Sequence, residues 1–211
     1  MSKFLLCFVS SCVLAVGFFY GCDHDEVTLR DIDHLQDLYN LRNLTNTNFE
    51  DEMDPSWSPD GRNIAFATYN GITVMDADGK NRVALTSAVS CSPSWSPDSQ
   101  RIAFYSNRDG NGEIYIMDAN GENQQNLTKS HIDETEPSWS PDGRRIAFVS
   151  DDSISVMDAD GKNRRILVEV SGWICNSPTW SPDGQSIAFS SRYEPENYEF
   201  WVKDIWVIDY P

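Results

Sequence analysis

The sequence predicts an all-β protein, a β-propeller of four four-stranded blades, on the basis of three observations. A stretch that begins at Pro55, PSWSPDGRNIAFATYNGITVMD, recurs in related copies that begin near Pro93, Pro137 and Pro178. The tryptophans of the copies are 38, 44 and 41 residues apart, and a period of about 40 residues is typical of propellers and solenoids. The copies read as units of four short β segments, the second of which is apolar on both faces. Such a strand is covered on both sides, which favours a propeller blade over a solenoid coil.

Each copy opens with Pro-Ser/Thr-Trp-Ser-Pro, whose prolines disfavour helix and limit strand pairing. An Asp-Gly turn follows in three copies, whereas the second copy has Asp98-Ser99 there. A strand reading Ile-Ala-Phe comes next. Third strands are expected at Ile72 to Met75, Ile114 to Met117, Ile154 to Met157 and Ile205 to Ile208. Weaker fourth strands are expected to end near Leu85, Leu127 and Leu167. The repeat tryptophans are expected to lie between blades and hold the core: Trp57, Trp95, Trp139 and Trp180.

The motifs WSPDG, IAF and VMDADG together resemble those of TolB-like β-propellers, the Pro-Asp relatives of the WD-type repeat. The resemblance covers roughly residues 43–210 and recurs four times. It implies the propeller fold and interaction with other proteins of the bacterial envelope. It does not imply one function, because such repeats serve scaffolds, binding modules and the non-catalytic domains of peptidases.

The last copy ends after its third strand, and a candidate for the missing strand lies near the other end of the propeller region. Leu41 to Thr45, LRNLT, matches QQNLT at Gln124 to Thr128. We expect residues 41–45 to complete the last blade and close the ring, because an open edge strand invites aggregation. A monomer follows from this closure. A fragment of a larger ring, or a ring made by two chains, is the alternative.

The chain has 211 residues and a formal net charge of −17, with 40% hydrophobic residues. This composition is globular and long enough for one sizeable core. A nucleic-acid partner is disfavoured, because phosphate binding requires a basic surface. The charge fits either simple solubility or a basic partner.

Residues 1–21 read as a lipoprotein-type signal peptide, with Lys3 followed by an uncharged run from Phe4 to Gly21. Phe19-Tyr20-Gly21-Cys22 resembles the lipoprotein box, which implies acylation at Cys22. An uncleaved anchor helix and plain secretion are the alternatives. Residues 22–40 read as a linker with a short helix, and residues 41–211 as the propeller. All three interpretations place the propeller in the cell envelope, on the periplasmic or extracellular side. In the favoured interpretation a lipid attaches it to the membrane.

Catalysis is not expected. The sequence has no G-x-S-x-G motif and only three histidines, and no Cys/His group has zinc-ligand spacing. We therefore expect no enzyme activity, no cofactor and no metal. Cys91 and Cys175 are expected to be buried free thiols rather than a disulfide, because they belong to different blades.

Comparison of the copies separates two faces of the expected disc. The WSPDG and DADG turns on one face are nearly identical, whereas the loops of the other face diverge, and repeat proteins often bind through the variable face. The candidate binding face comprises an acidic set and an aromatic set. The acidic set is Asp51, Glu52, Asp54, Asp133, Glu134 and Glu136. The aromatic set is Trp173, Tyr193, Tyr198, Phe200 and Trp201.

These features predict an exported, lipid-anchored TolB-like propeller that acts as a non-catalytic protein-binding scaffold in the bacterial envelope. In a closed ring the six acidic side chains would converge on one axial mouth and attract a positively charged partner. The aromatic set supplies typical interface anchors, or it folds back as a satellite core. The alternatives are a propeller that senses carbohydrates or small ligands, and a propeller-type lyase or detached peptidase propeller.

Overall fold

A computed structural model describes residues 41–47, 51–193 and 202–210. All of its strands belong to one compact unit, to which residues 50–211 are assigned, whereas residues 41–47 belong to a second unit. The expected signal peptide, Cys22 and the linker helix lie outside the described residues. No helix in the described part of the chain is long and apolar enough to cross a membrane.

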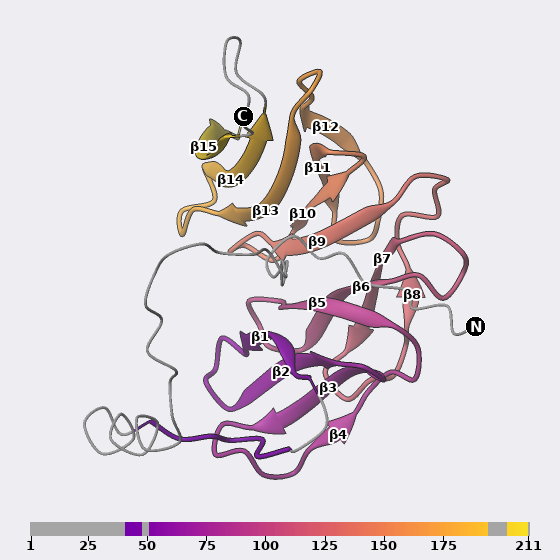
Figure 1. The fold of residues 1–211 in the computed structure, drawn as a ribbon, viewed down its shortest axis with the longest axis vertical. Coiled ribbons are helices and arrows are strands. Elements are labelled where there is room, and N and C mark those ends of the chain that lie inside the picture. The colour runs from indigo at the N-terminus through magenta and orange to yellow at the C-terminus, as the bar shows by residue number, and fades with distance from the viewer. Residues whose placement is uncertain (1–40, 48–50, 194–201, 211) are drawn as a thin grey trace, which may run out of the picture. The chain divides into compact units, whose positions relative to one another are not determined.

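The described strands form four separate antiparallel sheets, one from each sequence copy, in chain order (Figure 1). The first blade contains β1 (Met53–Trp57), β2 (Asn63–Thr68), β3 (Gly71–Asp76) and β4 (Val83–Ala84). The second contains β5 (Ser90–Trp95), β6 (Arg101–Ser106), β7 (Glu113–Asp118) and β8 (Gln125–Asn126). The third contains β9 (Glu134–Trp139), β10 (Arg145–Ser150), β11 (Ser153–Asp158) and β12 (Arg165–Val168). The fourth contains β13 (Ile174–Trp180), β14 (Ser186–Tyr193) and β15 (Val202–Asp209). The predicted all-β propeller of four blades is confirmed.

The expected completion of the fourth blade by residues 41–45 is not seen among the described residues and stays a prediction. That sheet has the order β13-β14-β15, and residues 41–47 contain no strand. Locally, the Asn43 side-chain oxygen accepts hydrogen bonds from the Thr45 and Asn46 amides, at 3.2 and 2.9 Å. This turn competes with extended pairing. The matching Asn126 makes the same turn at the end of the two-residue strand β8.

Successive blades pack through apolar faces, each of which joins two sheets. Ile72 of the first blade shares a cluster with Trp95 and Phe104 of the second. Ile114 shares a cluster with Trp139 of the third blade in the same way. Among the described strands, none of the first blade contacts any of the fourth. The four blades therefore do not close a ring by themselves.

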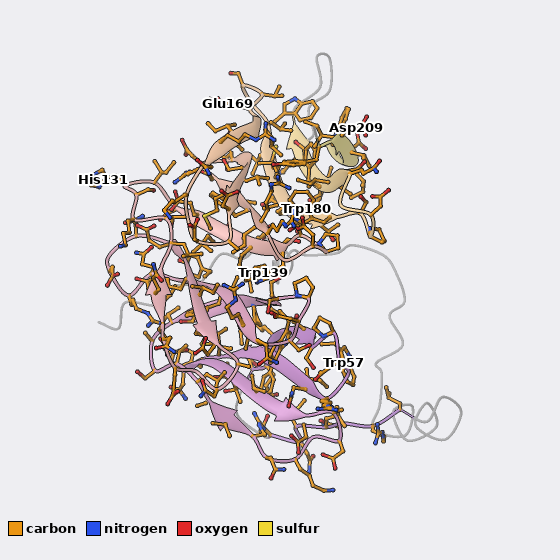
Figure 2. The ribbon with its side chains drawn as sticks, turned by 180° about the vertical axis from the view of Figure 1, so that it is seen from behind. Trp57, His131, Trp139, Glu169, Trp180 and Asp209 are labelled. Carbon is orange, nitrogen blue, oxygen red and sulfur yellow. The ribbon has the colours of Figure 1, made fainter. Side chains whose placement is uncertain are left out.

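Three of the four repeat tryptophans are buried between blades as predicted, at 6% exposure for Trp95, 7% for Trp139 and 9% for Trp180. The indole nitrogens of Trp95 and Trp180 donate to carbonyl oxygens of the preceding blade, at 3.1 and 3.2 Å. Trp57 is 56% exposed, so the prediction is wrong for the first blade. The reason is that no described strand packs on that side of its tryptophan (Figure 2).

The WSPDG turn has the same hydrogen-bonded construction in every blade. In the third blade the Ser140 hydroxyl donates to Asp142 at 2.6 Å and accepts from the Arg145 amide at 2.9 Å. The hydroxyl lowers the pKa of the Asp142 carboxyl because it stabilises the charged form. In the second blade Ser99 adopts φ 60°, which is unfavourable without glycine. The Ser99 hydroxyl accepts a hydrogen bond from the Asp60 amide of the first blade at 3.1 Å, so this serine also joins the two blades.

The two cysteines of the propeller, Cys91 and Cys175, are buried free thiols, as predicted. They lie in the first strands of the second and fourth blades. Burial raises the pKa of the Cys175 thiol. A buried, protonated thiol of this kind packs as a small apolar side chain.

Candidate interaction surface

Every first strand contains a bulge whose central residue has a left-handed backbone conformation. The residues are Asp54, Ser92, Glu136 and Ser177, with φ of 51°, 52°, 54° and 53°. The bulge displaces the strand and turns this side chain towards the neighbouring blade. Asp54 accepts the Ser92 amide at 3.1 Å, and Glu136 accepts the Ser177 amide. Two residues of the acidic set therefore join one blade to the next.

Two further members of the acidic set are paired with arginines of their own blades. Glu52 lies 3.1 Å from the Arg82 guanidinium, and Glu134 lies 2.7 Å from that of Arg164. The first pair is partly exposed, with side-chain exposures of 27% for Arg82 and 17% for Glu52. Glu134 is fully buried. Burial raises the pKa of Glu134, while Arg164 and the Ser130 hydroxyl oppose this rise.

The remaining two acids lie in the loops that precede the first strands. Asp133 accepts the Gly112 amide of the second blade at 2.7 Å, and Asp51 is exposed. The expected convergence of all six on one mouth requires a closed ring, which the four blades do not form. In the described part of the chain, no group of three or more acidic, histidine or cysteine side chains is arranged to hold a metal ion. Five of the six carboxylates therefore form hydrogen bonds or ion pairs with other groups of the propeller.

The aromatic set is only partly visible. Tyr198, Phe200 and Trp201 lie outside the described residues, and Tyr193 ends β14. Trp173 is half-buried before β13 and packs on Trp206, with ring centroids 4.6 Å apart and planes at 46°. Trp206 is 37% exposed.

Trp206 is not among the predicted site residues, although the sequence contains a signal for it. Trp206 lies in the third strand of its blade, at the place where the other blades have Thr73, Tyr115 and Ser155. The fourth blade alone puts a tryptophan there. Alignment of the third strands, rather than of the loops alone, would have found it.

Grooves between successive blades lie along the face that carries the WSPDG and DADG turns. One, of about 580 Å³, runs between the second and third blades and is lined by Arg101, Gln125 and Lys162 among others. A smaller one, of about 270 Å³, lies between Pro141 and Trp180. The repetitive turns therefore frame these grooves, whereas the predicted binding residues belong to the opposite, variable face.

Comparisons with known proteins agree with the architecture. Putative TolB from Agrobacterium tumefaciens is 24% identical, with a TM-score of 0.66 over 78% of this chain and 64% of that chain. TolB from Acinetobacter baumannii is 27% identical, with a TM-score of 0.63 over 76% of this chain and 41% of that chain. An oligogalacturonate lyase in complex with manganese is 14% identical, with a TM-score of 0.61 over 79% of this chain and 52% of that chain, and this likeness shows the fold alone.

The chain thus spans less than two thirds of each of these solved structures. No curated protein matches the sequence. The family model of the TolB β-propeller domain, PD40, matches residues 24–155, which is more than half of the chain. The protein therefore belongs to the TolB β-propeller domain family.

Proposed function

We propose that the chain is an exported, lipid-anchored scaffold of the bacterial envelope that binds another envelope protein without catalysis. The observation that carries this proposal is the Trp173–Trp206 pair on the fourth blade, which remains partly exposed on a rigid sheet. Membership in the TolB family supports the same role at a general level.

The tryptophan pair has the properties of a binding anchor. Indole rings bury 150–250 Å² each and lose little conformational entropy when they bind, because few of their bonds rotate. The pair is fixed from below, since Trp173 packs against the cluster of Cys175 and Phe189. Arg192 is exposed one residue before the end of β14, on the same blade. We therefore place the partner contact at this end of the fourth blade, with the acidic loops in a secondary role.

Photo-cross-linking in cells tests this placement. A benzoylphenylalanine at Trp206 is expected to capture one envelope protein repeatedly, identified by mass spectrometry. The matched control is the same probe at Arg62, which lies in the β1–β2 turn of the first blade and has an 83% exposed side chain. Equal capture from both positions would contradict a specific surface. Oligosaccharide binding on a glycan array that is lost in Trp206→Ala, without any cross-linked protein, would instead support the carbohydrate-sensing alternative.

The lipid anchor makes a separate prediction. Cys22 follows an uncharged run that ends at Gly21, which is the pattern of an acylated cysteine at a cleaved signal. Metabolic labelling with palmitate is expected to mark the wild-type chain and to be lost in Cys22→Ser. Cys12→Ser, within the same leader, is the control and should retain the label. Equal labelling of wild type and Cys22→Ser would remove the lipid anchor from the proposal.

A further inference from the structure

Tyr210 of the fourth blade inserts its ring against the third blade. The Tyr210 amide donates to the Gln185 carbonyl of its own blade at 2.7 Å, which fixes the start of the side chain. The guanidinium groups of Arg145 and Arg165 lie over the ring, at 4.9 and 4.8 Å from its centroid. The ring also meets the Trp180 indole edge-on, with centroids 4.9 Å apart. A tyrosine ring therefore occupies a site that two arginines and a tryptophan surround.

The interface between the second and third blades has Ala159 where the next interface has Tyr210. The Ala159 amide donates to the Arg144 carbonyl at 2.8 Å, which is the same main-chain contact that Tyr210 makes with Gln185. A methyl group thus replaces the ring, and Ala159 lines the groove of about 580 Å³ between these blades. This volume lies within the range of about 300–1,000 Å³ that is typical of ligand pockets.

The second blade lines this groove with the counterparts of the residues around Tyr210. Arg101 lies at the strand position of Arg145. Gln125 lies at that of Arg165. The apolar part of the lining consists of Ile116, Met117, Leu127 and Ala159. The groove therefore retains the surroundings of a tyrosine ring, with one arginine in place of two.

Arg101 is the cation that can hold such a ring. The other basic residue of the groove, Lys162, is already paired with Asp160 at 2.7 Å. The Arg101 guanidinium lies over the Trp139 ring at 4.9 Å, and a planar guanidinium can stack on aromatic rings with both of its faces. The two basic residues of the lining are balanced by Asp118 and Asp160. This balance favours a neutral phenol ring over an ion.

We propose that this groove binds a tyrosine side chain of a partner protein, in the manner in which the third blade holds Tyr210. Tyr210 directly follows β15, so an extended segment delivers its ring. A partner presents its tyrosine in the same way, and the exposed side chains of Gln125 and Lys162 leave the groove open to it. The residues that line the groove belong to the second and third blades. The site is therefore distinct from the tryptophan pair on the fourth blade.

Binding of a short peptide to the full-length chain tests the site. The probe is acetylated and amidated VIDYP, the sequence around Tyr210, and VIDAP is the matched peptide without the ring. NMR of the isotope-labelled chain follows the indole signal of Trp139, which Trp139→Phe identifies, because Arg101 lies over this indole. VIDYP is expected to shift this signal saturably, whereas VIDAP is expected to leave it in place.

Three results of this titration would overturn the proposal. Equal shifts with both peptides would show that the ring is not recognised. No shift with VIDYP would show that the groove takes no tyrosine. An affinity for p-cresol equal to that for VIDYP would assign the groove to a small aromatic molecule instead of a protein.

Variants of the groove test which residues hold the ring. Arg101→Asn matches Asn63, the equivalent residue of the first blade, and should weaken VIDYP binding about tenfold through loss of the cation–ring contact. Ala159→Tyr should abolish VIDYP binding and raise Tm, because the new ring fills the groove. Arg62→Asn changes an 83% exposed side chain of the first blade and should bind VIDYP like wild type. Wild-type affinity in Arg101→Asn, or VIDYP binding by Ala159→Tyr, would contradict the proposed site.

Discussion

Trp139→Ala is expected to lower the free energy of unfolding by about 3–5 kcal/mol. Trp139 is 7% exposed between the second and third blades, and Arg101 lies over its ring at 4.9 Å. Removal of the indole deletes apolar contacts on both blades and leaves a cavity between them. For a chain of this length the loss corresponds to a fall in Tm of roughly 6 to 20 °C. Thermal unfolding followed by circular dichroism measures it.

Trp57→Ala is the matched control, because it removes the same side chain from the same place in the repeat. The Trp57→Ala variant should change Tm by much less, since Trp57 is already exposed. Phenylalanine variants refine the comparison. Trp95→Phe should cost about 1 kcal/mol more than Trp139→Phe, because Trp95 donates to the Ser56 carbonyl and the Trp139 nitrogen has no acceptor among the described residues. Equal effects of Trp139→Ala and Trp57→Ala would contradict the packing described here.

Arg164→Met is expected to destabilise the protein by about 3–5 kcal/mol at neutral pH, because it leaves the buried Glu134 carboxylate without its cation. Arg164 also lies over the Phe148 ring at 5.2 Å, and methionine retains part of that contact. Chemical denaturation at several pH values gives the measurement. Glu134→Leu in the same chain should recover much of the loss, since it removes the unpaired charge.

The pH dependence of this variant has a defined sign. The folded-state pKa of Glu134 is raised above its ordinary value of 4.5, so the folded protein binds more protons than the unfolded chain above that pH. The contribution of Glu134 to stability is therefore greatest at low pH and falls as the pH rises through its folded pKa. Loss of Arg164 raises that pKa further, so the deficit of Arg164→Met should shrink as the pH falls towards 4.5.

Arg82→Met is the control for the buried pair. It breaks the equivalent contact with Glu52 in the first blade, where both side chains keep some exposure to water. The expected loss is about 1 kcal/mol or less, with a weak pH dependence. A loss as large as that of Arg164→Met would show that burial does not control the cost.

The fold could be predicted from the sequence because its determinants are local and repeated. The WSPDG turn, the Ile-Ala-Phe strand and the third strand recur in each copy. The repeat tryptophan, the Ile-Ala-Phe side chains and the first isoleucine of the third strand are each buried in at least three blades. A strand or turn predicted in one copy is therefore supported by the same prediction in the other copies. Trp57 is the informative failure, because its burial depends on a neighbouring blade and not on its own sequence.

The candidate site was harder to predict because side-chain pairing is not local. Glu134 and Arg164 are 30 residues apart in sequence, and Asp54 reaches an amide 38 residues away. A run of acids before a strand therefore looked like a binding surface, although the structure uses most of it internally. The Trp173–Trp206 contact likewise joins a loop to a third strand, and only the folded sheet brings the two together.

The bulge contacts alternate along the chain, which makes two blades, not one, the structural period. Acidic bulge residues occur in the first and third blades, and serines occur in the second and fourth. The Glu–Arg pairs likewise occur in the first and third blades. The heptapeptide DADGKNR, which ends in the paired arginine, is identical at 76–82 and 158–164. Insertion of a single blade would set two acidic bulges, or two serine bulges, side by side. Arrays built from this repeat should therefore tolerate lengthening and shortening in even steps only.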